Sequence, residues 1–381
     1  MPHPLDEYPI HQAPLSVRYP ATSDRNFYDR CYFNAHDRTG DLFLVTGFGV
    51  YPNLGVTDAY ATVRRGDLQH TVRFSDALGD DRMTQAVGGY RLEVLDPLRS
   101  IRITCDETGV ADGAVGFDLT WTGSFPAVEE QPHTMRTGDR IILDACRFAQ
   151  VGTWSGELRV AGETLEVTPD RWVGTRDRSW GIRPVGEADP PGRFATEQPA
   201  DWGFWWLYLP LRFDDFAVVL IAQEDGAGHR TLNDAVRVWP EASGRSPELL
   251  GWPHISIRYR PGTRDAVGTT VAVRGADGEP FTIEVTSEGW VALNAGPGYG
   301  GDPDWSHGAW RGRGWSEALT VDVTDPSITG RAVFGVVDHV GRAVVRGGPH
   351  DGAEGWGLFE HGTIGAHAPS GFVDLGSVAG A

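Results

Sequence analysis

The chain has 381 residues and a formal net charge of −19, and all 33 of its basic residues are arginine. This length allows two domains with buried cores of their own. The acidic balance excludes nucleic acid and anionic membrane surfaces as expected partners, because binding to either depends on Lys and Arg. The lack of lysine excludes Schiff-base catalysis and phosphate-loop ATPases, which need a primary side-chain amine.

The three cysteines, Cys31, Cys105 and Cys146, lie far apart and fit neither a disulfide framework nor a Cys-x-x-Cys site. The first residues lack the pattern of a secretory signal. The longest apolar run, residues 216–222, is much shorter than the roughly 20 residues of a membrane-spanning helix. The sequence therefore predicts a cytoplasmic protein without membrane insertion, and it leaves the oligomeric state open.

Gly and Pro are abundant, at 50 and 25 residues, which favours many short strands over long helices. In both predicted hairpins apolar and polar residues alternate on either side of a turn, and Asp277-Gly278 in the second turn tolerates positive φ. Since no long window has a 3.6-residue apolar stripe, we expect few and short helices. In chain order the predicted elements are strands at 42–45, 90–94 and 101–104, a hairpin at 156–167, a strand at 217–222, a hairpin at 271–286 and a strand at 332–337.

A segment rich in Pro and charge, residues 186–201, separates two strand-rich halves. It predicts an N-terminal β domain at 1–190, a linker at 191–201 and a C-terminal β domain at 202–381. Two all-β domains of this size suit antiparallel barrels or bent sandwiches, whose interiors can hold a small ligand.

Sequence motifs of dinucleotide-binding proteins, hydrolases and metal sites are incomplete or absent. The letters G-x-G-x-x-G occur at 296–301, but Asp-Pro-Asp-Trp follows them where a dinucleotide site needs a helix. The chain contains neither G-x-S-x-G nor H-E-x-x-H. Acidic residues near His133 and His307 lie in Pro- or Gly-rich loops without closing metal ligands. We therefore expect no metal, nucleotide or other cofactor.

The most distinctive segment, residues 172–184, reads W-V-G-T-R-D-R-S-W-G-I-R-P. As a strand it places Asp177 on one face and Arg176, Arg178 and Trp180 on the other. Desolvation would keep an inward-facing acid protonated for use as a general acid, whereas nearby arginines favour its ionised form. Two interpretations stay open at this point: Asp177 is a catalytic acid, or the acid and arginines form a buried polar staple between the domains.

This segment, with C-R-F-A-Q-V-G-T-W-S-G at 146–156, resembles the carotenoid 1,2-hydratase-like superfamily. Members pair two lipocalin-like β domains and include carotenoid and kievitone hydratases, pericyclases and lipid carriers. The resemblance therefore implies two lipocalin-like domains around a hydrophobic ligand. In motif order it covers most of the chain, with further matching stretches at 32–34, 51–55 and 202–215.

In the hydratases the acid of this motif protonates an isoprenoid double bond, so the resemblance assigns that role to Asp177. The sequence departs from the family at two histidines, one replaced by Arg178 and the other by Gln150 or a neighbour. Arg176 and Arg178 are then expected to set the charge of Asp177, and Gln150 to position water or substrate. A binding or pericyclic role needs neither histidine.

Candidate ligand-contacting side chains are aromatic, because ring faces stabilise cations and shape apolar pockets. With 14 tryptophans in the chain, core packing is the competing explanation for several of them. The first hypothesis is a cofactor-independent lyase or isomerase acting on an isoprenoid, polyketide or lipid-like molecule near the domain junction. The second is a non-catalytic carrier of such a molecule. The candidate ligand-binding residues are Trp172, Trp180, Trp206, Tyr208, Tyr299 and His307.

Overall fold

The computed structural model describes residues 4–106, 110, 115–186, 192, 194, 199, 201–276, 278–300, 302–303, 305–332 and 335–380. Strands dominate this part of the chain, and its helices are short: α1 (Pro326–Ala332) and the 3-10 turns η1 (Pro4–Glu7), η2 (Glu241–Ser243) and η3 (Ala368–Ser370). The predicted all-β class with few short helices is confirmed. None of the helices in the described ranges is long and apolar enough to cross a membrane.

The first of two antiparallel sheets contains β1 (Phe27–His36), β2 (Leu42–Tyr51), β3 (Val56–Arg65), β4 (Leu68–Ala77), β5 (Ala86–Val87), β6 (Tyr90–Asp96), β7 (Ser100–Cys105), β8 (Val115–Gly123), β9 (Val128–Glu129), β10 (His133–Thr137), β11 (Arg140–Val160), β12 (Glu163–Val167), β13 (Val173–Ile182) and β21 (Trp315–Asp322). Its main path runs β21-β4-β3-β2-β1-β13-β11-β8-β7-β6-β5, and β9, β10 and β12 pair with β11.

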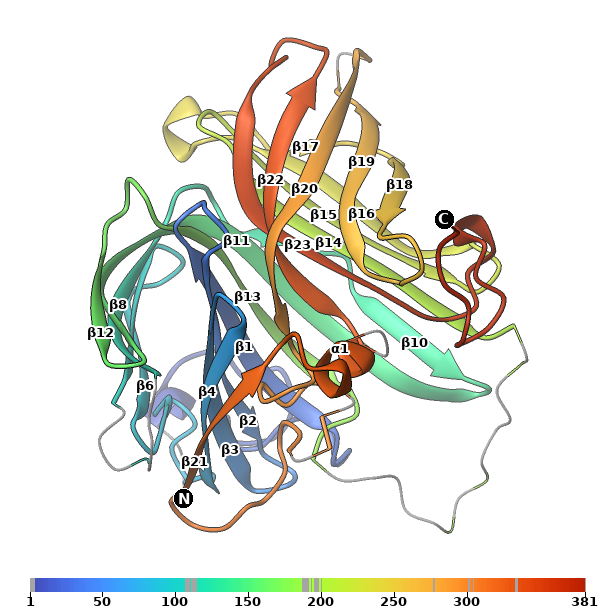
Figure 1. Ribbon diagram of the computed structural model, residues 1–381. Coiled ribbons are helices and arrows are strands. Elements are labelled where there is room, and N and C mark those ends of the chain that lie inside the picture. Colours follow the sequence, from blue (N-terminus) through green and yellow to red (C-terminus); the bar gives the residue numbers. More distant parts are fainter. Residues whose placement is uncertain are drawn as a thin grey trace.

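The second sheet contains β14 (Gly203–Arg212), β15 (Ala217–Asp225), β16 (Arg230–Val238), β17 (Glu248–Leu249), β18 (His254–Tyr259), β19 (Ala266–Arg274), β20 (Pro280–Ala292), β22 (Val337–Arg346) and β23 (Glu354–Gly365). Its order is β17-β16-β15-β14-β23-β22-β20-β19-β18. Figure 1 shows the two sheets as separate curled layers. They agree with the expected pair of lipocalin-like domains.

Three apolar cores explain why the sheets curl and why they pack together. Trp121 and Trp154 lie in the core inside the first sheet, and Phe359 lies in the core inside the second. A third core, which includes Val45 of the first sheet and Leu358 of the second, joins the two. Because side chains alternate along a strand, the central strands bury one face in their own core and the other face between the sheets.

The predicted hairpins are confirmed by their register. Leu158 of β11 pairs with Leu165 of β12, and Val271 of β19 pairs with Ile283 of β20. Asp277 of the second turn lies outside the described residues, while Gly278 has a φ of +81°, a value that glycine adopts without strain.

The strand predicted at 332–337 needs correction. Ala332 ends helix α1, β22 begins only at Val337, and residues 333 and 334 lie outside the described ranges. The Asp325 carboxylate accepts a hydrogen bond from the Ser327 backbone N–H at 2.8 Å and so caps the start of the helix. A short apolar run does not distinguish the end of a buried helix from a strand, which explains the error.

The predicted linker at 191–201 lies mostly outside the described residues, and the domain boundaries at 190 and 202 stay a prediction. One strand crosses between the two halves of the sequence: β21 pairs with β4 at the edge of the first sheet. In Figure 1 the orange β21 lies beside the blue β4. The second half of the chain therefore contributes to the first sheet.

Candidate functional site

A cavity of about 200 Å³ lies between the two sheets. Strands β1, β10, β11 and β13 of the first sheet form one side of it, and β14 and β23 of the second sheet contribute the other. A concave site with mostly apolar walls and a few polar groups is typical of small-molecule binding. The aromatic part of its wall is formed by Tyr28, Tyr32, Phe204, Trp206 and Tyr299.

The alternation of β13 turns Asp177 toward this cavity. Asp177 pairs in register with Tyr32 of β1, so both side chains point to the same side of the sheet. Two residues further along β13, Ser179 pairs with Arg30 of β1 and Arg147 of β11. The sheet thereby places two arginines from neighbouring strands beside Asp177.

Asp177 is a carboxyl without a partner. No hydrogen bond or ion pair joins its side chain to another described residue. Burial raises its pKa to about 7; Arg147 and Arg30 oppose the rise, whereas Glu130 and Glu360 add to it. At neutral pH the group is therefore present in both protonation states, which suits a proton donor.

Arg147 is already paired. Its Nε donates a hydrogen bond to Glu130 Oε2 at 2.6 Å, and its guanidinium carbon lies 4.5 Å from the ring centroid of Tyr208. Burial raises the pKa of Glu130, and the Arg147 guanidinium lowers it. The two members of this ion pair act on the pKa of Asp177 in opposite directions, and neither forms a hydrogen bond with the Asp177 carboxyl.

Two further acids, Asp338 of β22 and Glu360 of β23, pair across the second sheet. The Tyr32 hydroxyl donates to Asp338 Oδ2 at 2.5 Å, and the Trp206 indole N–H donates to Glu360. Burial and the Glu360 carboxyl raise the pKa of Asp338 well above its usual value, which favours the protonated form. Both acids are thus held by cavity-lining rings, unlike Asp177.

An adjoining hollow of about 240 Å³ shares part of this wall. Arg30, Arg183 and Tyr299 line both spaces, and His307 lines the hollow. Arg30 is 6% exposed, and its guanidinium carbon lies 5.1 Å from the ring centroid of Tyr299. These shared side chains make the two spaces parts of one site.

Behind the hollow, His307 faces a second buried acid, Asp58, with 3.9 Å between Nδ1 and Oδ2. Asp58 accepts hydrogen bonds from the Tyr51 hydroxyl at 3.0 Å and the Gly308 backbone N–H at 2.7 Å. Burial raises the pKa of Asp58 to about 7 and lowers that of His307 well below its usual value. His307 is therefore a neutral imidazole at neutral pH.

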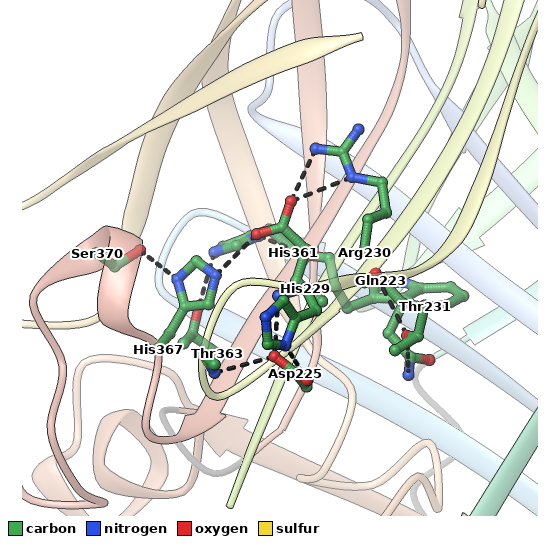
Figure 2. Close-up of polar contacts among 12 residues, drawn as sticks. Gln223, Asp225, His229, Arg230, Thr231, His361, Thr363, His367 and Ser370 are labelled. Carbon is green, nitrogen blue, oxygen red and sulfur yellow. Dashed lines mark hydrogen bonds and ion pairs between the residues drawn. The ribbon is translucent and has the colours of Figure 1, made fainter. Parts of the chain in front are cut away.

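A separate polar cluster occupies the far side of the second sheet (Figure 2). Glu224 accepts a hydrogen bond from His367 Nε2 at 3.0 Å and another from Arg230 Nη2 at 2.7 Å. The other ring nitrogen of His367 lies 2.8 Å from Ser370 Oγ. A small hollow of about 100 Å³ nearby is lined by His361, whose Nδ1 donates to the Trp206 carbonyl at 2.6 Å.

The family model that matches this chain spans residues 3–373. The chain belongs to this family of unknown function, DUF8625. No curated protein sequence matches the chain.

Several solved structures are similar to this DUF8625 protein at low sequence identity. Kievitone hydratase from Nectria haematococca is 14% identical with a TM-score of 0.49, over 87% of this chain and 88% of that one. CghA, alone and with Sch210972, is 12% identical with a TM-score of 0.48, over 88% of each chain. At these identities no residue role passes from those proteins to this one.

The polar residues that flank Asp177 in the DUF8625 sequence lie on the opposite face of the sheet. Gln150 accepts hydrogen bonds from Arg176 Nε and Nη2 at 2.9 and 2.8 Å, and it donates to the backbone carbonyls of Leu98 and Phe125. It does not line the cavity. Its amide therefore joins parts of the first sheet. The expectation that Gln150 positions water or substrate at Asp177 does not agree with this placement.

Arg178 also points away from the cavity. Its Nε donates to Asp29 and its Nη1 to Gln85, both at 2.9 Å. Strand alternation turns both side chains to the other face, so neither Arg176 nor Arg178 forms a hydrogen bond or ion pair with Asp177. Arg176 still interacts with the Asp177 charge across the sheet. The arginines on the cavity face come from neighbouring strands.

Some of the aromatic residues predicted to bind the ligand line the cavity, and others do not. Trp206 and Tyr299 line the cavity, and Tyr208 packs behind it against Arg147. Trp172 is buried in the core of the first sheet, and Trp180 is 37% exposed on the face opposite Asp177. Neither Trp172 nor Trp180 lines the cavity.

Sequence reasoning missed Arg30, Arg147, Glu130 and Glu360. The strand that carries Arg30 contained a usable signal, because apolar Cys31 and Phe33 alternate there with polar or aromatic residues at even positions. Both faces of β1 are largely buried. Polar side chains on such a strand indicate a cavity face rather than a solvent face.

Proposed function

We propose that this protein is a cofactor-independent, hydratase-like lyase or isomerase of a hydrophobic unsaturated molecule of the isoprenoid, polyketide or lipid-like class. The substrate occupies the cavity between the sheets, and Asp177 is the acid. One observation carries the proposal: a carboxyl with a pKa of about 7 and no hydrogen-bond or ion-pair partner among the described residues faces a cavity whose wall combines aromatic and aliphatic side chains with charged ones.

The other acids of the cavity are less suited to this role. Glu130 is bound to Arg147, and Glu360 accepts a hydrogen bond from Trp206. An oxygen of each of these two acids is therefore engaged within the protein, whereas no hydrogen bond joins the Asp177 carboxyl to another described residue. Asp177 is free to meet a ligand.

The reaction follows from this placement. Protonated Asp177 gives its proton to one carbon of a C=C bond, whose π electrons form the new C–H bond and leave the other carbon as a cation. The aromatic side chains of the cavity wall stabilise that cation. Water adds to the cation and returns a proton to the Asp177 carboxylate, giving an alcohol. Without water, loss of a neighbouring proton to Asp177 gives an isomer instead.

Identification of the bound molecule is the first test. The protein is purified from its own host, inspected by native mass spectrometry and extracted with organic solvent. The extracted molecule is then incubated with fresh protein in D₂O. Catalysis by protonation places solvent deuterium on a carbon of the product, at a rate that depends on active protein. Recovery of the molecule unchanged, without deuterium, would contradict the catalytic proposal and support the carrier hypothesis.

A further inference from the structure

Two arginines stand where the cavity meets the adjoining hollow. Arg30 lies on β1, Arg183 directly follows β13, and each lines both spaces. The guanidinium of Arg30 lies over Tyr299, and that of Arg183 lies 5.6 Å from the ring centroid of Tyr28. The rings hold both cations in place at the edge of the site.

Neither guanidinium has a counter-ion in the part of the chain that the structure describes. Other buried arginines have an acceptor: Arg237 binds Glu248 at 2.7 Å, and Arg176 donates to Gln150 at 2.9 Å. A buried charge without a partner costs several kcal/mol on the general scale. Arg30, at 6% exposure, is such a charge, and a ligand is the partner that the site lacks.

Besides Asp177, a second described acid interacts with the charge of Arg30, namely Asp58. Asp58 is instead held by the Tyr51 hydroxyl and the Gly308 N–H. No ion pair joins it to Arg30 among the described residues. The donors of Arg30 therefore remain available to a molecule in the cavity.

We propose that Arg30 and Arg183 bind a carboxylate of the ligand, so that the substrate is a mainly apolar, unsaturated monoacid. The planar guanidinium matches a carboxylate with two parallel hydrogen bonds. Arg30 pairs with Ser179, two residues from Asp177, so a carboxylate held there leaves the adjoining carbon chain close to Asp177. This inference rests on the proposed function and names the class of its substrate.

The cavity also argues for a single negative charge. Asp177, Glu130 and Glu360 all line it, and a dianion such as a phosphate monoester would meet three carboxyl groups. Like charges in a low-dielectric site repel strongly. A carboxylate with an apolar body satisfies the two arginines and places its uncharged part against the aromatic wall.

Binding of cinnamate and of its methyl ester, measured by isothermal titration calorimetry, tests this site. The two probes share an unsaturated aromatic body and differ in the negative charge. We expect the full-length protein to bind cinnamate about tenfold more tightly than the ester or better, as for a hydrogen bond to a charged group. Arg30→Gln and Arg183→Gln should each reduce that preference and leave ester affinity unchanged. Arg178→Gln, on the opposite face, should preserve it.

Each outcome separates this proposal from the proposed function. Ester and acid bound equally by wild type, or a full preference for the acid in Arg30→Gln, would overturn the carboxylate site while the cavity and Asp177 stand. Binding of neither probe would overturn the ligand cavity and both proposals. If the protein prefers cinnamate over the ester but incorporates no deuterium into the extracted molecule, the carboxylate site is supported and catalysis is rejected.

Discussion

The cavity between the sheets and the cluster around Glu224 contain the same kinds of side chains but differ in how these are partnered. In the Glu224 cluster the carboxylate meets His367 and Arg230, and the second nitrogen of His367 meets Ser370 (Figure 2). In the cavity, Asp177 and Arg30 have no partner among the described residues. Satisfied polar clusters stabilise a fold, whereas unsatisfied charges on a cavity wall indicate a ligand.

A large effect is expected on the pH dependence of turnover. Because Asp177 acts as an acid, only its protonated form is active, and its pKa is raised to about 7. We expect the rate to fall about tenfold per pH unit above that value, or about a hundredfold over two units. Steady-state rates on the extracted substrate from pH 6 to 9 check this. A rate that rises across this range would mean that Asp177 acts as a base.

Loss of a carboxyl from the satisfied cluster should affect stability instead. Glu224→Ala leaves His367 and Arg230 without their shared acceptor, and we expect a loss of about 2 to 3 kcal/mol in the free energy of unfolding. Urea unfolding followed by tryptophan fluorescence measures it. Asp177→Asn breaks no hydrogen bond or ion pair with another described residue, and it removes a group whose charged form is disfavoured by burial. At neutral pH it should therefore unfold at a urea concentration at or above that of wild type. An equal loss in the free energy of unfolding in Glu224→Ala and Asp177→Asn would contradict the difference between the satisfied cluster and the cavity.

The free energy of unfolding should also depend on pH through Asp177. The pKa of Asp177 is higher in the folded protein, at about 7, than its usual value of 3.8, so the folded state binds the proton more tightly. Stability from this group is therefore present below about pH 4 and is lost as pH rises toward 7. We expect the stability of wild type to fall relative to Asp177→Asn over this window. A constant difference between the two proteins would contradict the raised pKa.

The smallest expected effect comes from the face of β13 that points away from the cavity. Arg178→Gln removes a half-buried ion pair with Asp29, and we expect a loss of about 1 kcal/mol or less. Ligand affinity should stay the same. Thermal unfolding and cinnamate titration check both statements, and a large loss of affinity would show that this face contributes to the site.

Strand alternation predicted the face of Asp177, because that inference needs only the local period of two. It could not predict that Arg30 and Arg147 lie beside Asp177, since their strands flank β13 only through the order of strands in the sheet. The acids Asp338 and Glu360 come from the second sheet and depend on how the two sheets pack. Gln150 was misassigned because proximity in sequence motifs does not fix which face a side chain occupies.

Turnover of Asp177→Asn tests the central claim most directly. The substitution keeps the size and removes the proton donor, and Asp118→Asn, at an exposed ion pair on the same sheet, is the matched control. We expect Asp177→Asn to lose about 10² to 10⁴-fold in rate while binding the extracted ligand as wild type does. The control should keep full activity. Undiminished turnover by a folded Asp177→Asn protein would contradict the assignment of Asp177 as the acid.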